Sequence, residues 1–368
     1  MSTKDKLLFT PGPLTTSSTV KEAMLHDYGS RDHIFIDSVK EIRNRLLHYS
    51  GVKKEEGYDT IIMQGSGTFG VEAVMQTAIP KNGHLLIIIN GAYGERIAKM
   101  VNILNIENTN LIYAEDEFPK LEEIENALKT NTAITHVAVV HCETTSGIFN
   151  PIYEIGQLVK SYGKIYVVDA MSSFGAVPVN VKDCGIDYLV SSSNKCIEGV
   201  PGFSFAIVNT RHLNTCKGNS RSLSLDLYEQ WKGLETNGQF RFTPPVHSLM
   251  AFRQALQELE EEGGVAGRSL RYQSNFKLLM DGMTQLGFQP YLSKEKQGYI
   301  INTFHSPTHS NYHFETFYQK LNERGYVIYP GKLTKANCFR IGNIGRIYSE
   351  DIEGLLKAIE QVKNEMGF

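Results

Sequence analysis

The sequence is poor in cysteine, in clustered basic residues and in long apolar runs, and each absence excludes a class of protein. No apolar run approaches the length of a membrane span, and residues 1–6 lack the apolar core of a signal peptide. The five cysteines form no C-x-x-C pair, which argues against a disulfide framework or structural zinc and favours a reducing compartment. We therefore expect a cytoplasmic protein. Its cysteines are Cys142, Cys184, Cys196, Cys216 and Cys338.

Length and composition predict a globular protein of two domains. The 368 residues exceed what one hydrophobic core usually holds, and the contents of 41% hydrophobic and 21% charged residues are ordinary. The net charge is −3 without a basic block, so nucleic acid is not an expected partner. We expect an N-terminal arm plus a large α/β domain over residues 1–250 and a small α+β domain over residues 251–368.

Strand-length apolar segments alternate with helical patterns between residues 60 and 169. This alternation predicts a mostly parallel sheet with helices on both faces. Further on, the pattern predicts a helix over 221–231 and a polar loop over 233–239. Strands near 299–304, 326–329 and 338–341, with helices near 315–324 and 349–366, make up the predicted small domain.

A lysine between two predicted buried strands is the first candidate for chemistry. Lys195 follows the apolar run 186–190 and precedes the run 203–208, with a Gly/Pro-rich turn on its carboxyl side. Burial disfavours the ammonium form and lowers the pKa of a lysine. A neutral amine is what Schiff-base chemistry requires. A surface lysine in a hairpin loop is the alternative.

An aspartate at the end of the preceding strand fits the same chemistry. Asp169 closes the apolar strand 164–168, and Lys195 follows it by 26 residues. Such a pair suits pyridoxal phosphate (PLP), whose aldehyde binds the lysine and whose protonated ring nitrogen pairs with the acid. Alone, Asp169 also suits a helix cap or a strand-end turn.

A turn rich in glycine and hydroxyl groups joins the predicted strand 60–63 to a helix over 71–78. Backbone N–H groups, hydroxyls and the positive end of a helix make the turn 64–70 a predicted phosphate site. Gly65, Gly67 and Gly70 also match the dinucleotide pattern G-x-G-x-x-G, but the next strand ends in Asn90 rather than in the expected acid. A turn that only packs helix on strand is the third interpretation.

Polar or aromatic residues follow two further strands. Tyr93 follows the strand 85–89. Its ring could stack on a pyridine ring, or it could fill space between the following helix and the sheet. His141 and Glu143 follow the strand 133–140, as a catalytic pair or as strand-end polar groups, with Thr144 or Thr145 free to bind a ligand. These positions, the phosphate turn and Asp169 all fall at predicted carboxyl ends of strands, where α/β sheets bind ligands.

Arg340 lies inside the predicted apolar strand 338–341, where an unpaired charge is costly. It suits a structural salt bridge. It also suits a fork that binds a substrate carboxylate with two parallel hydrogen bonds, and we favour this role.

Motifs along nearly the whole chain resemble the class V PLP-dependent aminotransferases of fold type I. Within that family, the resemblance is to members that move the amino group of 2-aminoethylphosphonate to pyruvate, giving phosphonoacetaldehyde and L-alanine. The motifs are TPGPLTTS at Thr10, VKEAM at Val20, QGSGT at Gln64, NGAYG at Asn90, VDAMSSFG at Val168, SSNKCIEGVPGF at Ser192, SRSLSLDLY at Ser220, VIYPGK at Val327 and FRIGNIG at Phe339.

The resemblance implies a fold, a cofactor and roles for individual residues. The fold would be a seven-stranded, mostly parallel sheet with a smaller C-terminal α+β domain. Lys195 would carry PLP and Asp169 would pair with its ring nitrogen, while Arg340 would hold the pyruvate or alanine carboxylate. Family members are dimers with shared sites, so Thr243 is expected to reach the cofactor phosphate of the partner subunit. The other implied cofactor contacts are Ser66, Gly67, Thr68, Tyr93 and Thr145.

Other functions remain open at this stage. Alanine–glyoxylate aminotransferases and cysteine desulfurase-like lyases share the family resemblance. A desulfurase needs a mobile nucleophilic cysteine, and Cys196 is poorly placed for that role beside Lys195. A nucleotide-binding dehydrogenase or a binding module without catalysis is the third class.

Overall fold

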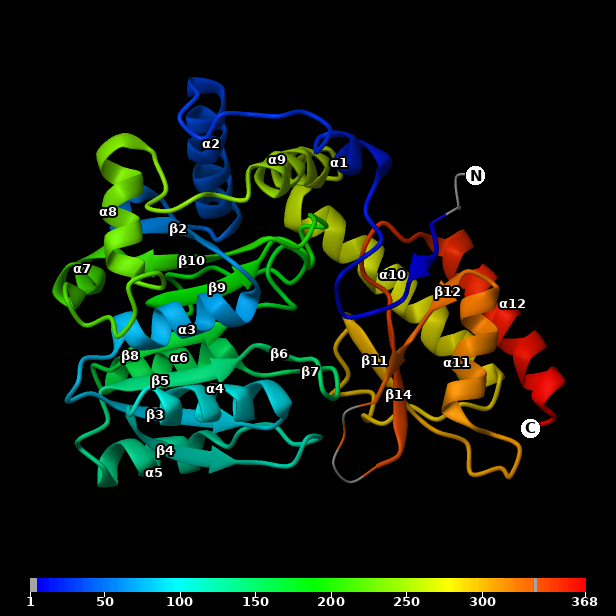
Figure 1. Ribbon diagram of the computed structural model, residues 1–368. Helices are drawn as coiled ribbons and strands as arrows, with labels where there is room; N and C mark the ends of the chain where they lie inside the picture. The colour runs from blue at the N-terminus through cyan, green and yellow to red at the C-terminus, as the bar shows by residue number, and fades with distance from the viewer. Residues whose placement is uncertain (1–4, 332, 334–335) are drawn as a thin grey trace.

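A seven-stranded sheet forms the centre of the computed structural model, which describes residues 5–331, 333 and 336–368. The last residue of the motif at Val327 therefore lies outside the described residues. The strand order is β2-β10-β9-β8-β5-β3-β4 (Figure 1). The strands are β2 (Tyr58–Gln64), β3 (His84–Ile89), β4 (Glu107–Ile112), β5 (His136–Val140), β8 (Ile165–Asp169), β9 (Tyr188–Ser192) and β10 (Phe203–Asn209).

Strand direction brings the candidate residues to one edge of this sheet. β3 pairs in parallel with β4 and β5, β5 with β8, and β8 with β9, whereas β10 runs antiparallel between β9 and β2. The carboxyl ends of the parallel strands therefore meet at the edge where β10 begins. The chain leaves β9 at that edge, passes Lys195 and returns as β10. The predicted α/β fold with a mostly parallel sheet is confirmed.

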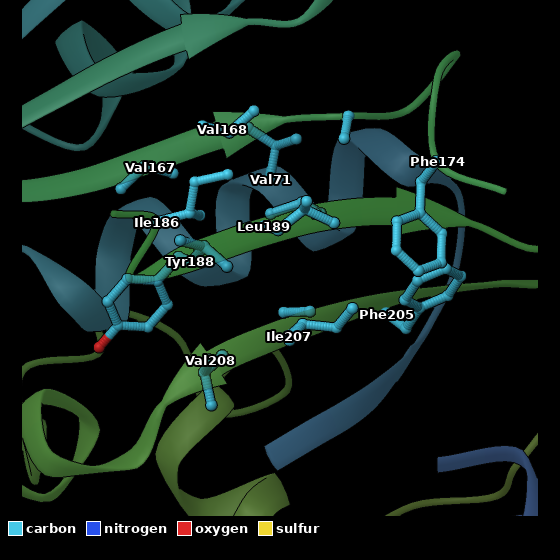
Figure 2. Close-up of a cluster of buried hydrophobic side chains, with 14 of the residues drawn as sticks. Val71, Val167, Val168, Phe174, Ile186, Tyr188, Leu189, Phe205, Ile207 and Val208 are labelled. Carbon is cyan, nitrogen blue, oxygen red and sulfur yellow. The ribbon is translucent and has the colours of Figure 1, made fainter. Parts of the chain in front are cut away.

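Helices cover both faces of the sheet (Figure 1). α3 (Gly67–Ala78) and α4 (Ala92–Ile103) lie on one face, and α5 (Leu121–Thr130) and α6 (Ile152–Ser161) lie on the other, as right-handed crossovers require. Figure 2 shows apolar side chains of the central strands packed together. Val167 and Val168 are consecutive on β8 and point to opposite faces, yet both are buried.

A smaller unit follows in sequence. Its sheet has the order β11-β14-β13, with β11 (Ile301–His305), β13 (Tyr329–Pro330) and β14 (Cys338–Gly342). α10 (Gly264–Gln285), α11 (Phe314–Glu323) and α12 (Ser349–Met366) pack around a second core that contains Leu279, Phe317, Phe339 and Ile359. The proposed boundary at residue 250 falls inside α9 (Val246–Glu261), whose buried side chains belong to the large core.

The N-terminal arm joins the two units. β1 (Leu7–Leu8) pairs in parallel with β12 (Tyr326–Val327) of the small unit, and the chain then returns to the large unit through α1 (Ser18–Glu22). Besides α8, described below, the remaining elements are α2 (His33–Tyr49), β6 (Cys142–Glu143), β7 (Ile148–Phe149), α7 (Thr210–Leu213) and two 3-10 turns, Lys54–Glu56 and Asn214–Cys216. Within the described residues, no helix combines the length and apolarity needed to cross a membrane.

The helix predicted over 221–231 is displaced in the structure. α8 spans Leu227–Asn237, because the Asp226 carboxylate accepts the Glu229 N–H at 3.0 Å and caps the helix there. The segment 233–237 is therefore helical rather than a loop. Gly233 suggested a break, but Leu234 is buried against the core and outweighs the low helix propensity of one glycine. Gly238, with φ of 73°, ends the helix.

Candidate active site

A cleft at the carboxyl edge of the large sheet brings together six of the predicted residues. Ser66, Gly67 and Thr68 come from the start of α3, Tyr93 from the start of α4, Asp169 from the end of β8 and Lys195 from the β9–β10 connection. Residues that the sequence analysis did not single out also line the cleft. They include Arg96, Met171, Ser172, Ser192 and Asn194.

Lys195 is partly buried beside the N-terminal arm. Its Nζ donates a hydrogen bond to the Pro11 carbonyl oxygen at 2.5 Å, and a side chain on Gly12 would collide with that Nζ. Burial lowers the pKa of Lys195 to about 8, although Asp169 acts in the opposite direction. The lowered pKa increases the neutral fraction relative to a solvated lysine, and the enclosure of the side chain in the cleft contradicts the alternative of an ordinary surface lysine.

Asp169 is buried at the end of β8. Its Oδ1 accepts the Met171 N–H at 2.9 Å, and within the described part of the chain Oδ2 has no hydrogen-bond partner. Burial raises the pKa of Asp169 to about 6, although the Met171 N–H, Arg96 and Lys195 act in the opposite direction. The carboxylate is therefore mostly ionised at neutral pH and leaves one oxygen free for a cationic ligand.

The turn between β2 and α3 has the geometry of an anion site. Gly65 has φ of +102°, and Ser66 occupies the N-cap position in an extended conformation without a capping hydrogen bond from its side chain. The N–H groups of Gly67 and Thr68 have no acceptor among the described residues, as the first turn of a helix leaves them. A Cβ on residue 67 would lie 2.3 Å from the Met171 sulfur, so a larger residue here would displace the end of the Met171 side chain.

Arg96 is a site residue that the sequence analysis missed. Its guanidinium carbon lies 4.7 Å from the centroid of the Tyr93 ring, and its Nη1 donates to the Thr68 hydroxyl at 3.3 Å. The spacing of three residues from Tyr93 on a helix contained the signal, because residues i and i+3 share a face. Arg96 thus places a permanent positive charge beside the predicted phosphate turn.

Thr145 does not line the cleft but lies directly behind it. Its hydroxyl accepts the Ala92 N–H at 2.9 Å and donates to Glu143 Oε1 at 2.6 Å. Glu143 Oε2 in turn accepts the N–H groups of Tyr93 and Gly94, each at 3.3 Å. Burial raises the pKa of Glu143 to about 7. The pair therefore fixes the start of α4 and with it Tyr93.

The structure does not support His141 and Glu143 as a catalytic pair. His141 is buried, its Nδ1 has no hydrogen-bond partner in the described chain, and no hydrogen bond joins it to Glu143 there. Burial lowers the pKa of His141 to about 4. A neutral histidine that is held away from the cleft fits the interpretation as a strand-end polar group.

Arg340 is fully buried on β14, next to the cleft rather than on its lining. Its Nη1 donates to the Thr144 carbonyl oxygen at 2.7 Å and its Nε to the Pro330 carbonyl oxygen at 3.0 Å. Its guanidinium carbon lies 4.9 Å from the Tyr329 ring centroid, and Nη2 has no hydrogen-bond partner among the residues that the structure describes. No carboxylate of the described residues forms a salt bridge with it, so the structural ion-pair alternative fails.

Thr243 lies apart from the cleft of its own chain. It is exposed on the connection between α8 and α9, and its carbonyl oxygen accepts a hydrogen bond from Gln64 Nε2 at 3.2 Å. Gln64 leads directly into the phosphate turn. The expected role of Thr243 toward a partner subunit stays a prediction.

The comparisons with known proteins agree with this geometry. Residues 16–342 match the family model for class-V aminotransferases. A relative from Vibrio vulnificus is 52% identical over 96% of this chain and 97% of its own, and one from Bacillus cytotoxicus is 50% identical over the same shares; both are named 2-aminoethylphosphonate--pyruvate transaminase.

A solved alanine--glyoxylate aminotransferase from Nostoc sp. superimposes with a TM-score of 0.90 at 26% identity, covering 98% of this chain and 96% of that one. Since the family model spans most of the sequence and the neighbouring structure shares the fold over nearly its whole length, the resemblance stated from the motifs is confirmed. The chain belongs to the class-V aminotransferase family.

Proposed function

We propose that this protein transfers the amino group of 2-aminoethylphosphonate to pyruvate, giving phosphonoacetaldehyde and L-alanine, with PLP as cofactor. The observation that carries the proposal is the meeting of Lys195, Asp169 and the start of α3 in one cleft. The chain is also about half identical to relatives with that printed activity. An aminotransferase needs these three features to hold a phosphorylated pyridine aldehyde.

The donor set fits the cofactor group by group. The two N–H groups of Gly67 and Thr68 that lack an acceptor suit the phosphate, with the hydroxyls of Ser66 and Thr68 beside them. The unpaired Oδ2 of Asp169 suits the protonated ring nitrogen, and the Tyr93 ring suits an aromatic face. Lys195 suits the aldehyde. When bound, PLP supplies an electron sink for the carbon that carries the amino group.

Lys195 acts as the proton carrier. Lys195 would hold the aldehyde of the cofactor, and its Nζ, when free, would take up the proton that leaves the amino-bearing carbon of the substrate. A pKa of about 8 lets the same amine accept and release protons near neutral pH. Burial in the cleft and the contact with Pro11 restrict where Nζ lies.

Asp169 holds a negative charge at the far end of the cofactor site. Its pKa of about 6 leaves it ionised at neutral pH, and a cationic partner stabilises that form further. Thr145 and Glu143 act behind the site, where they hold the N-terminus of α4 and hence the Tyr93 ring.

Arg340 is the proposed anion-binding residue for the substrates. Two of its donor nitrogens already bind backbone carbonyls, whereas Nη2 is buried and has no partner within the described part of the chain. An unpaired buried donor is costly, so a substrate carboxylate is its natural acceptor. Because a phosphonate is also an oxyanion, the same arginine could serve both substrates in turn.

The desulfurase alternative is weakened by Cys196. The Cys196 thiol is buried and donates to the Ser172 carbonyl oxygen at 3.3 Å, and burial raises its pKa to about 12. A thiol that stays protonated and enclosed is a poor nucleophile. The five cysteines are free and buried, which supports the proposed cytoplasmic location. We further propose a homodimer in which Thr243 reaches the partner's cofactor phosphate.

An amino-donor panel with pyruvate as acceptor tests the proposal. The purified protein, loaded with PLP, is offered 2-aminoethylphosphonate and a set of amino acids, and alanine formation is followed. We expect 2-aminoethylphosphonate to be the preferred donor and glyoxylate to be a poor substitute for pyruvate. Protein that shows no visible absorbance removable by borohydride would overturn the PLP assignment, and a preferred amino-acid donor would overturn the substrate.

A further inference from the structure

A buried cluster of charges lies behind Lys195, outside the cleft. It consists of Glu198, Glu262, Arg268, Arg271 and Tyr272, and we call it the α10 cluster because three of its members lie on that helix. Arg268 and Tyr272 are fully buried, and Glu198 is almost so. Two arginines face two glutamates, so the charges balance. Arg268 Nε and Arg271 Nε donate to the two oxygens of Glu262 at 2.6 and 2.7 Å.

Members of the α10 cluster form hydrogen bonds with the turn that follows Lys195. The Glu198 N–H donates to the Lys195 carbonyl oxygen at 2.7 Å, and Arg268 Nη1 donates to the Cys196 carbonyl oxygen at 2.6 Å. Glu198 also has φ of 66°, a conformation that is unfavourable for residues other than glycine. The chain is thus held in a tight turn directly after Lys195 by partners on α10.

The same cluster also forms hydrogen bonds with residues 345–347, which follow the strand that carries Arg340. Arg271 Nη1 donates to the carbonyl oxygens of Gly345 and Ile347 at 2.6 and 3.1 Å, and the Gly345 N–H donates to the Tyr272 hydroxyl at 2.9 Å. Gly345 follows the end of β14 by three residues. The exit of the arginine strand is therefore held by the helix that holds the lysine turn.

The Tyr272 hydroxyl and the Arg271 guanidinium connect the Lys195 turn directly to the segment after β14. The Tyr272 hydroxyl donates to Glu198 Oε1 at 2.6 Å while it accepts from Gly345, and Arg271 Nη2 donates to the same Glu198 oxygen at 2.7 Å. Glu198 Oε2 and Arg268 Nη2 have no partner in the described structure although both are buried. A network that is incompletely satisfied is a poor source of stability.

We infer that Glu198 and Tyr272 are positioning residues that hold the Lys195 turn and the Arg340 strand in one fixed relation. Proton transfer at Lys195 and anion binding at Arg340 then depend on a single support. The inference rests on the proposed function, because it gives the two held residues their roles.

Tyr272→Phe is the direct test, since it removes the bridging hydroxyl and keeps the ring. Tyr166→Phe is the matched control: Tyr166 is equally buried, and its hydroxyl donates to the Ile152 carbonyl oxygen at 3.2 Å in the large core, away from the cluster. We expect Tyr272→Phe to lower kcat/KM for pyruvate about tenfold, ~1.4 kcal/mol, with both kcat and KM affected. The control should lose stability but keep its kinetics. Equal kinetics for the two variants would overturn the inference.

Hydrogen exchange separates this inference from the proposed function. In Tyr272→Phe, residues 195–199 and 343–347 should exchange faster together, whereas Tyr166→Phe should leave both segments unchanged. This readout needs no catalysis, so it stands even if the donor panel fails. Glu198→Gln, which keeps the shape of the side chain but removes the charge, should accelerate the same two segments. Faster exchange in only one segment, or in neither, would show that the cluster does not couple them.

Discussion

The two sides of the cleft present their functional groups differently. On the large-sheet side, Lys195, Asp169 and the start of α3 all line the cleft. On the small-unit side, Arg340 is enclosed, and two of its nitrogens already bind backbone carbonyls. The comparison indicates that the large-sheet side is a preformed part of the proposed cofactor site, whereas the small-unit side offers the proposed anion one nitrogen, Nη2, that has no partner among the described residues.

The difference follows from how each side is built. The large-sheet residues extend from strand ends and a helix start, where the backbone turns away and leaves side chains and N–H groups exposed. Arg340 lies in the middle of β14, where its side chain is buried and bonded to backbone carbonyls of neighbouring segments. Substitutions on the first side should therefore impair every reaction, and those on the second should distinguish between substrates.

The largest effect is expected at Lys195. Lys195→Ala removes the group proposed to bind the cofactor aldehyde and to carry the proton, so alanine formation should fall by at least about a thousandfold. Far-ultraviolet circular dichroism should stay that of the wild type, because the side chain is only partly buried. Near-normal turnover in a folded variant would contradict the preformed cofactor site.

Asp169→Asn should come next. A neutral amide cannot stabilise a protonated ring nitrogen, so turnover should fall by about two orders of magnitude or more, with weaker PLP binding. Burial already penalises the ionised carboxylate, whose pKa of about 6 lies above its ordinary value. The cofactor-free variant should therefore unfold no more easily than wild type at neutral pH. A loss of turnover under about tenfold, ~1.4 kcal/mol, would remove Asp169 from the ring-nitrogen role.

Arg340→Lys tests whether the small-unit side of the cleft distinguishes between the two substrates. It keeps the charge but loses the planar guanidinium, so the pyruvate half-reaction should lose about 1–3 kcal/mol of transition-state binding. The half-reaction with 2-aminoethylphosphonate, followed in a single turnover without pyruvate, should lose less.

The outcomes of Arg340→Lys separate three roles. Equal losses in the two half-reactions would show that Arg340 serves the carboxylate and the phosphonate in turn. A loss in neither would remove Arg340 from substrate binding. Because lysine can still bond one of the two carbonyls, thermal unfolding is measured in parallel to identify a purely structural loss.

The smallest effect is expected in the pH dependence of the rate at which Lys195 reacts with PLP. Only the neutral amine attacks an aldehyde, and burial lowers the pKa of Lys195 to about 8. Capture of PLP by the cofactor-free protein should therefore accelerate from about pH 7 to about pH 9 and then level off, whereas a free lysine side chain accelerates up to about pH 10. Stopped-flow absorbance at constant ionic strength follows both. A protein rate that still climbs steeply above about pH 10 would contradict a lowered pKa.

The sequence by itself determined the fold class and which residues gather at the carboxyl edge of the large sheet. Strand-length apolar runs alternating with helical patterns require a parallel sheet, and residues just after such runs must gather at one edge. Lys195, Asp169 and the 64–70 turn could be located for this reason, without knowledge of any contact. The extent of α8 was missed because the burial of Leu234 outweighs Gly233, and burial depends on distant parts of the chain.

Only the tertiary structure decided how the pieces meet. Sequence spacing could not show that Glu143 and Thr145 hold α4, because their partners lie some fifty residues away. It could not show that Arg340 lacks a carboxylate partner, or that α10 holds both the Lys195 turn and the end of β14. Local patterns report which face of a strand or helix is buried, whereas these contacts depend on how separate elements pack, which is fixed only when the whole chain folds.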